Sequence, residues 1–428
     1  MSVLLDLTPI RQHPAYRRLW WGLGVSNFGT QLTVVAVGLQ VYGLTRSTLS
    51  VGVLGICALV PLVVLGLYGG ALVDQYDRRR VALIASGGLW LVSIGLALQA
   101  YLHADSVGLL YGLVAAQSAG FAINNPARSA IVPRLVPREL LPAANVLQTV
   151  TFNLALTVGP LVGAFLVAGP GYGAAYSVDV VLFTAALYAL WRLPDLPPGT
   201  TEDPDAARKR GLASVLEGLR YLATRPNVRM TFVVDLIAMI TAMPRVLLPA
   251  VGVVYLGGGA ETTGVLTAAF AVGAVLVGLF SGKIVGLRWQ GRVITMSIAG
   301  FGVSVAAFGV VLLVLGRHSP ASPVRWALIL CVICLAGSGA ADAVSSVFRQ
   351  TILQAATPDS MRGRLQGVFI VVVAGGPRLG DLVLGAQSTW LGDAGAALVG
   401  GLLCLTLVIL VTARQRRFLR YDALDPQP

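Results

Sequence analysis

Long hydrophobic runs separated by short polar stretches dominate this chain. Each run has about 20 residues, enough for a helix rising about 1.5 Å per residue to cross roughly 30 Å of hydrocarbon. The pattern therefore predicts an all-α membrane protein. Its twelve expected transmembrane helices are at residues 19–43, 49–73, 81–101, 107–128, 143–168, 174–193, 229–256, 262–286, 292–315, 325–348, 365–390 and 394–413.

The composition agrees with this membrane class. Of 428 residues, 56% are hydrophobic and only 12% are charged. The formal net charge is +12, and the basic residues gather in every second connection and at both ends. That distribution follows the positive-inside rule, so the charge orients the chain and does not indicate nucleic-acid binding. Both termini are expected in the cytoplasm, and no cleavable signal peptide is expected.

Little in the sequence suggests an enzyme. The four cysteines all lie inside hydrophobic runs, which favours helix packing over a disulfide framework or a metal site. The chain has no HExxH, Walker A or dinucleotide-binding motif. We therefore expect no catalytic residue, no metal and no cofactor. Without an ATP site, uphill transport would have to draw on an ion gradient.

The chain contains an internal repeat. Pro14 stands before the first run and Pro226 before the seventh, 212 positions later. Arg128 and Arg349 likewise occupy equivalent places at the ends of the fourth and tenth runs. Two parallel six-helix halves follow, and such repeats are common in transporters. The predicted division is an N-terminal half at 1–193, a cytoplasmic linker at 194–226 and a C-terminal half with a short tail at 227–428. Within the linker, 212–222 is expected to form an amphipathic helix on the membrane face.

A polar turn follows the second run, with Gly70, Asp74, Arg78 and Arg79 in the spacing GxxxDxxxRR. Twelve spans as six plus six, together with this turn, resemble the major facilitator superfamily. Further positions resemble its enterobactin-exporter group of proton-coupled drug and siderophore antiporters. They are residues 13–17, 47–48, 51–52, 245–247, 249–250, 343–346 and 380–381.

The resemblance implies alternating access around a central cavity lined by the first, fourth, seventh and tenth spans. The polar turn would then act as a gating latch between moving helices. Because Arg128 and Arg349 occupy symmetrical positions, we expect them to anchor that turn. The expected gating residues are Gly70, Asp74, Arg78, Arg79, Arg128 and Arg349.

Charged residues within the spans are candidates for function, because a central arginine or aspartate costs about 2.5 to 3.5 kcal/mol to insert. Arg245 and Arg378 are expected at similar depth, where two cations would favour an anionic substrate. The alternative is that Arg378 pairs with Asp381, three residues later. Asn27 and Gln31 in the first span are further substrate-binding candidates, although helix packing also explains them.

Three aspartates are candidates for proton coupling. Asp235 and Asp342 have no basic residue three or four positions away, so burial would favour their proton-bound forms. Asp381 is the third candidate, unless Arg378 holds it ionised. Asp179 in the sixth span is expected to satisfy a neighbouring helix.

Together these features predict a bacterial inner-membrane exporter of a small organic molecule, with an anionic siderophore as the expected cargo and the proton gradient as its energy source. A monomer in contact with membrane lipids is expected. A multidrug antiporter for hydrophobic or cationic compounds is the alternative. Two positions disfavour it, since Thr30 and Leu23 stand where many multidrug relatives carry an acidic residue and an arginine. A lipid scramblase or a non-transporting membrane sensor is the alternative from another class.

Overall fold

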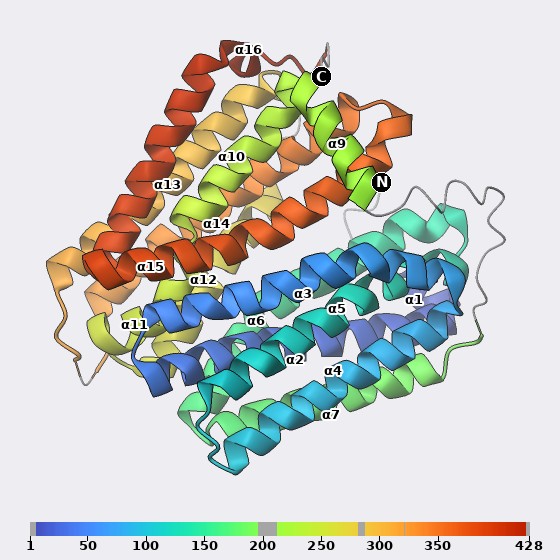
Figure 1. Cartoon of the computed structure of the whole chain (residues 1–428), viewed down its shortest axis with the longest axis horizontal. Coiled ribbons are helices and arrows are strands. Elements are labelled where there is room, and N and C mark those ends of the chain that lie inside the picture. The colour runs from blue at the N-terminus through green and yellow to red at the C-terminus, as the bar shows by residue number, and fades with distance from the viewer. Residues whose placement is uncertain (1–5, 196–211, 281–286, 321, 425–428) are drawn as a thin grey trace. The chain divides into compact units, whose positions relative to one another are not determined.

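The computed structural model describes residues 6–195, 212–280, 287–320 and 322–424. At some positions, including 67–75, it describes the backbone but not the side chains. Within these ranges the chain is helical, and its only β-type pairing is an isolated bridge between Trp289 and Asp422. Figure 1 shows the helices.

The described helices account for the expected spans. The first half contains α1 (Thr8–Gln12), α2 (Pro14–Thr45), α3 (Thr48–Gln75), α4 (Arg78–Tyr101), α5 (Val107–Leu135), η1 (Arg138–Leu140), α6 (Leu141–Ala168) and α7 (Tyr172–Trp191). The remainder contains α9 (Leu212–Thr224), α10 (Pro226–Ala242), η2 (Pro244–Leu247), α11 (Leu248–Ala250), η3 (Val251–Tyr255), α12 (Gly259–Phe280), α13 (Gln290–Leu315), α14 (Arg325–Ala355), α15 (Asp359–Arg414) and α16 (Arg416–Leu419). The repeat is visible here, because α2 begins at Pro14 and α10 at Pro226.

Eleven of the described helical segments are long and hydrophobic enough to cross a membrane. The last of them, Gly375–Arg414, is 40 residues long. Gly392 interrupts it with a left-handed φ of 70°, which a residue with a Cβ rarely adopts. This break falls between the eleventh and twelfth expected spans. Counting the two sides of Gly392 separately gives the twelve spans that the sequence predicts.

The chain folds as two compact units. Unit 1 comprises Met1–Leu44 and Cys57–Gly211, and unit 2 comprises Thr45–Ile56 and Leu212–Pro428. The first turns of α3 therefore belong to unit 2 and the rest of this helix to unit 1. Pro61 lies inside α3, four residues after Cys57. Residues 196–211, the middle of the predicted linker, lie outside the described part of the chain.

In unit 1, α4 packs against both α5 and α7. A buried cluster joins the beginnings of α2 and α6 to the end of α5, with Tyr16, Leu19, Ile131 and Leu147 among its members. The Tyr16 hydroxyl donates a hydrogen bond to the Ala144 carbonyl oxygen at 2.8 Å. The phenol therefore fixes α2 against α6 without leaving its polar atom unpaired.

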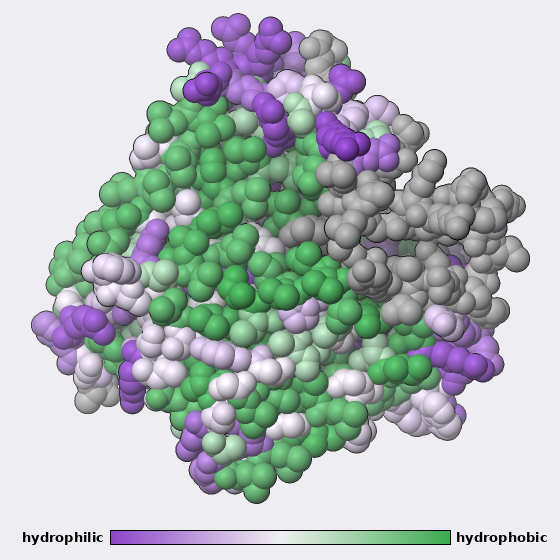
Figure 2. All heavy atoms as spheres, viewed as in Figure 1, coloured by the Kyte–Doolittle hydropathy of each residue, from purple (hydrophilic) through white to green (hydrophobic). Residues whose placement is uncertain are grey.

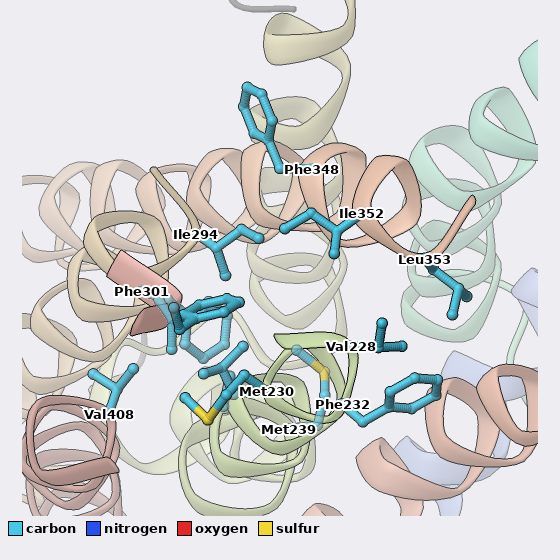
Figure 3. Packing of buried hydrophobic residues seen from close by; sticks show 14 of the residues in the cluster. Val228, Met230, Phe232, Met239, Ile294, Phe301, Phe348, Ile352, Leu353 and Val408 are labelled. Carbon is cyan, nitrogen blue, oxygen red and sulfur yellow. The ribbon is translucent and has the colours of Figure 1, made fainter. Parts of the chain in front are cut away.

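In unit 2, α13 packs against α14 and α15, and α10 packs against α15. Figure 3 shows the buried cluster between them, where Phe301, Met230 and Ile352 meet from three helices. The expected amphipathic helix is present as α9, which packs on α15 and adds Leu222 to this cluster. Figure 2 shows a largely hydrophobic surface over α13 and α15, with hydrophilic residues gathered near α16. Such a surface suits contact with lipid.

Candidate functional site

The seventh span is broken next to Arg245. The α10 helix ends at Ala242, Met243 is extended with ψ of 103°, and Pro244 begins the short 3₁₀ helix η2. Proline disfavours a helical conformation in the residue before it, which explains the break at Met243. A π-helical turn, η3, follows at Val251–Tyr255. Broken transmembrane helices and π turns are common where transporters bind substrates and ions.

The break presents Arg245 to a partner on α15. Arg245 Nη2 donates a hydrogen bond to Asp381 Oδ2 at 2.6 Å, which also makes an ion pair. The Arg245 side chain is 43% exposed, whereas that of Asp381 is 8% exposed. The residues on either side of the arginine, Pro244 and Val246, are both buried. The guanidinium therefore keeps donors accessible while one of its nitrogens is held by the carboxylate.

Arg378 completes a cationic cluster. It lies on α15 within electrostatic reach of both Arg245 and Asp381. The sequence left open whether Asp381 pairs with Arg378 three residues away; the partner that donates at 2.6 Å is Arg245 instead. Two arginines and one aspartate carry a net charge of +1 when all are ionised. We call these three residues the cationic cluster, and its excess charge suits an anion.

Glycine allows the close helix approach that forms this cluster. A Cβ at Gly380 would collide with the main-chain carbonyl of Met239 on α10, and one at Gly376 would crowd the Met239 side chain. The small residue before Asp381 therefore lets α15 lie directly against α10. The carboxylate is then within reach of the arginine that follows the helix break.

A second charged cluster lies between α10 and α14. Arg349 Nη1 pairs with Asp235, and both side chains are only 5% exposed. Arg349 Nη2 also reaches Asp342 Oδ1 at 3.5 Å, and that carboxylate is 25% exposed. With one arginine and two aspartates, this acidic cluster has a net charge of −1 when fully ionised.

The acidic cluster corrects two expectations. Asp235 and Asp342 are not without a cation, because Arg349 contacts both from 114 and 7 positions away. Arg349 was expected to anchor the polar turn, but its guanidinium is directed to these carboxylates. A search at three or four positions misses both contacts, because Asp235 has its partner on another helix and Asp342 has its partner seven positions later on the same helix.

Arg128 has different surroundings in unit 1. It is buried and donates to Ser26 Oγ at 2.8 Å and to Ser86 Oγ at 3.0 Å. Ser86 in turn donates to Asn124 Oδ1 at 3.1 Å. Hydroxyl groups of α2 and α4 thus bind Arg128, whereas carboxylates bind Arg349. The two positions that the repeat aligns are chemically unequal.

The polar turn is described only in part. Only the backbone is described at Gly70 and Asp74, so the expected latch contact with Arg128 stays a prediction. Arg78 Nη1 donates to the Ala130 carbonyl at 3.2 Å, and Arg79 Nη1 pairs with Asp195 at 2.6 Å. Both gating arginines are therefore bound within unit 1.

The remaining predicted substrate-binding residues lie on α2. Asn27 and Gln31 are half-buried. A Cβ at Gly159 on α6 would collide with Gln31, so this side chain packs closely on α6. This contact agrees with the helix-packing alternative for Gln31.

Two further aspartates have hydroxyl partners on other helices. Thr48 Oγ1 donates to Asp393 Oδ1 at 2.6 Å, with both residues buried in unit 2. Ser93 Oγ lies 2.7 Å from Asp179 Oδ2 in unit 1. The sequence shows each aspartate in or beside a hydrophobic run, which marks it as a residue that needs a partner. Which residue is that partner depends on how separate helices pack.

The chain matches the model of the transmembrane secretion effector family over residues 5–427. It belongs to this family of the major facilitator superfamily. An enterobactin exporter from a Shigella boydii serotype 18 strain is 33% identical over 425 residues, covering 97% of this chain and 96% of the exporter. An enterobactin exporter from an Escherichia coli O81 strain shows the same identity and coverage.

The major facilitator fold is also present in similar solved structures. A mutant of the peptide transporter POT has a TM-score of 0.75 at 14% identity, with 95% of each chain covered. The nucleoside transporter NupG has a TM-score of 0.70 at 12% identity, covering 95% of this chain and 99% of NupG. These relatives are transporters rather than enzymes, as the sequence predicted. The chain is a multi-pass membrane transporter.

Proposed function

We propose that the protein exports a small anionic organic molecule of the siderophore class from the bacterial cytoplasm across the inner membrane, in exchange for protons. The cationic cluster of Arg245, Arg378 and Asp381 is the observation that carries this proposal. It combines an excess positive charge, an accessible guanidinium and a broken helix. The similarity to enterobactin exporters over nearly the whole chain supports the siderophore class.

The cationic cluster can distinguish charges. Asp381 pairs with Arg245 and Arg378 lies near both, so these three residues together carry an excess positive charge when all are ionised. An anionic oxygen can compete with Asp381 for Arg245, since the arginine fork offers several donors. A cation would add to the positive charge already present. The geometry therefore favours an anion over a cationic drug.

The acidic cluster supports proton exchange as the energy source. Asp235 is as buried as its arginine partner, whereas Asp342 is five times as exposed and is held at 3.5 Å. A loosely held, partly accessible carboxylate exchanges protons more readily than one in a buried ion pair. We assign proton coupling first to Asp342, with Asp235 fixing Arg349. Asp381 takes part through its competition with cargo for Arg245.

The working cycle follows from the superfamily membership. Alternating access would expose the cationic cluster to the cytoplasm for loading and then to the outside for release. Both termini would lie in the cytoplasm, and the protein would act as a monomer among membrane lipids. The proton gradient would supply the energy for transport, and no cofactor would be required.

Everted membrane vesicles test the proposal. With an imposed proton gradient, vesicles containing the protein should accumulate a catecholate siderophore, and an uncoupler should abolish this accumulation. Vesicles with Arg245→Ala are the matched comparison. If a cationic dye is accumulated instead, catecholate does not compete, and Arg245→Ala has no effect, the protein is a multidrug antiporter.

A further inference from the structure

Asp179 is a fully buried acid in unit 1 that plays no part in the proposed transport chemistry. It lies on α7 with 0% exposure. Its carboxyl packs directly on α2, where a Cβ at Gly29 would collide with Oδ1. Leaving an ionised carboxylate in such a place is costly unless a cation and several donors compensate it.

The described surroundings of Asp179 supply hydroxyl groups but no cation in an ion pair with it. Its titratable neighbour is Tyr176 on the same helix, whose hydroxyl donates to Gln40 Oε1 at 2.7 Å. The hydroxyl of Thr33 on α2 lies beside the carboxyl group, but both this oxygen and Asp179 Oδ1 lack a hydrogen bond of good geometry. The described residues of α6 include no titratable side chain.

The arginines of the neighbouring helices lie elsewhere. Those of α2 and α4 stand near the beginnings of these helices, at positions 17–18 and 78–80. Arg128 of α5 binds Ser86, which precedes Ser93 on α4 by seven residues, or about 10 Å at the helical rise. No ion pair in the described part of the chain includes Asp179.

The hydrogen bonds at Ser93 indicate where a proton belongs. Ser93 Oγ lies 2.7 Å from Asp179 Oδ2 and 3.2 Å from the Leu89 carbonyl oxygen. A serine hydroxyl has one proton, so it cannot donate to both acceptors. If Asp179 carries a proton on Oδ2, it donates to Ser93, and Ser93 donates to Leu89. Both short contacts then become hydrogen bonds, and the unpartnered Oδ1 is the carbonyl oxygen of a neutral acid.

We propose that Asp179 is a proton-binding site of unit 1, occupied by a proton that bridges α7 to Ser93 of α4. This site is separate from the arginine-paired carboxylates of unit 2. It gives the transporter a protonatable group in unit 1. The proposal does not depend on whether the cargo is a siderophore.

Infrared spectra of the purified full-length protein in lipid test this proposal without any cargo. At neutral pH the wild type should show the C=O stretching band of a protonated carboxylic acid, and Asp179→Asn should remove it. Asparagine resembles the neutral acid in size, so Asp179→Asn should fold normally. Asp235→Asn is the matched control and should leave the band in place, because Asp235 pairs with Arg349 whereas Asp179 has no arginine partner in the described residues.

Ser93→Ala provides the second variant. It should keep the intensity of the Asp179 band but shift its frequency, since the acid loses its hydrogen-bond partner. The proposal is overturned if wild type and Asp179→Asn have the same spectrum in this region, or if Ser93→Ala leaves the band unmoved. A wild type that lacks the band but is stabilised by Na⁺ would also overturn it, in favour of a metal-bound carboxylate.

Discussion

Arg245 donates a hydrogen bond from Nη2 to Asp381 Oδ2 at 2.6 Å, although 136 positions separate the two residues in the chain. The pair joins the broken seventh span to the long helix α15. One partner is accessible and the other is buried, so a ligand can approach the arginine without first exposing the aspartate.

Arg245→Ala should reduce export of an anionic cargo by about tenfold or more. A hydrogen bond to a charged group contributes about 1.5–3 kcal/mol, and 1.4 kcal/mol corresponds to a factor of ten. Initial rates of catecholate accumulation in everted vesicles measure the effect. Arg245→Lys keeps the charge but loses the fork, so it should retain part of the activity. Equal activity in all three proteins would remove Arg245 from the binding site.

Asp342→Asn should uncouple export from the proton gradient. The variant cannot exchange a proton at this position, so its export rate should no longer respond to an imposed pH difference. Parallel vesicle assays at several external pH values measure this response. Asp422→Asn is a suitable control, because Asp422 pairs with Arg288 outside the spans. Unchanged pH dependence in Asp342→Asn would assign coupling to another group.

Asp235→Asn should lower the free energy of unfolding by about 3 kcal/mol, because it leaves the buried Arg349 with only the longer contact to Asp342, at 3.5 Å, as a counter-charge. Thermal unfolding of the purified protein in detergent measures this loss. The double variant Asp235→Asn with Arg349→Met removes the buried charge as well. It should recover much of the stability, and a double variant less stable than either single one would argue against the buried pair.

Asp74→Asn should leave the protein folded but slow its export, if the polar turn acts as a latch. The equivalent position in the second half is Gly286, which carries no charge. Gly286→Ala should therefore affect export less than Asp74→Asn does. Surface expression and export rate, measured together, separate loss of folding from loss of gating. Normal export by Asp74→Asn would exclude the latch.

Hydropathy was sufficient to predict the spans, because the cost of exposing a polar backbone to lipid restricts each hydrophobic run to a helix. Even the break at Gly392 falls in the predicted gap at 391–393. The irregular seventh span was not foreseen: 229–256 reads as one hydrophobic run, and only Pro244 and Pro249 hint at the interruption.

The charged partners could be predicted only where they are local. Arg378 and Asp381 share one helix, so the sequence suggested their pairing, but helix packing gave Asp381 a different partner. Arg349 was assigned to the polar turn from symmetry alone. The repeat preserves the position of this arginine but not its surroundings. Arg349 pairs with Asp235, whereas Arg128 has no acidic partner among the described residues and binds Ser26 instead.

The division of α3 between the two compact units has a mechanical consequence. Proline has no N–H, so Pro61 cannot donate the helical hydrogen bond to the carbonyl of Cys57, the first residue after the unit boundary. The helix α3 therefore bends most easily near the boundary between the part that belongs to unit 2 and the part that belongs to unit 1. Cys57 is half-buried at this boundary. A spectroscopic label on its thiol would therefore report changes in the curvature of α3 during turnover.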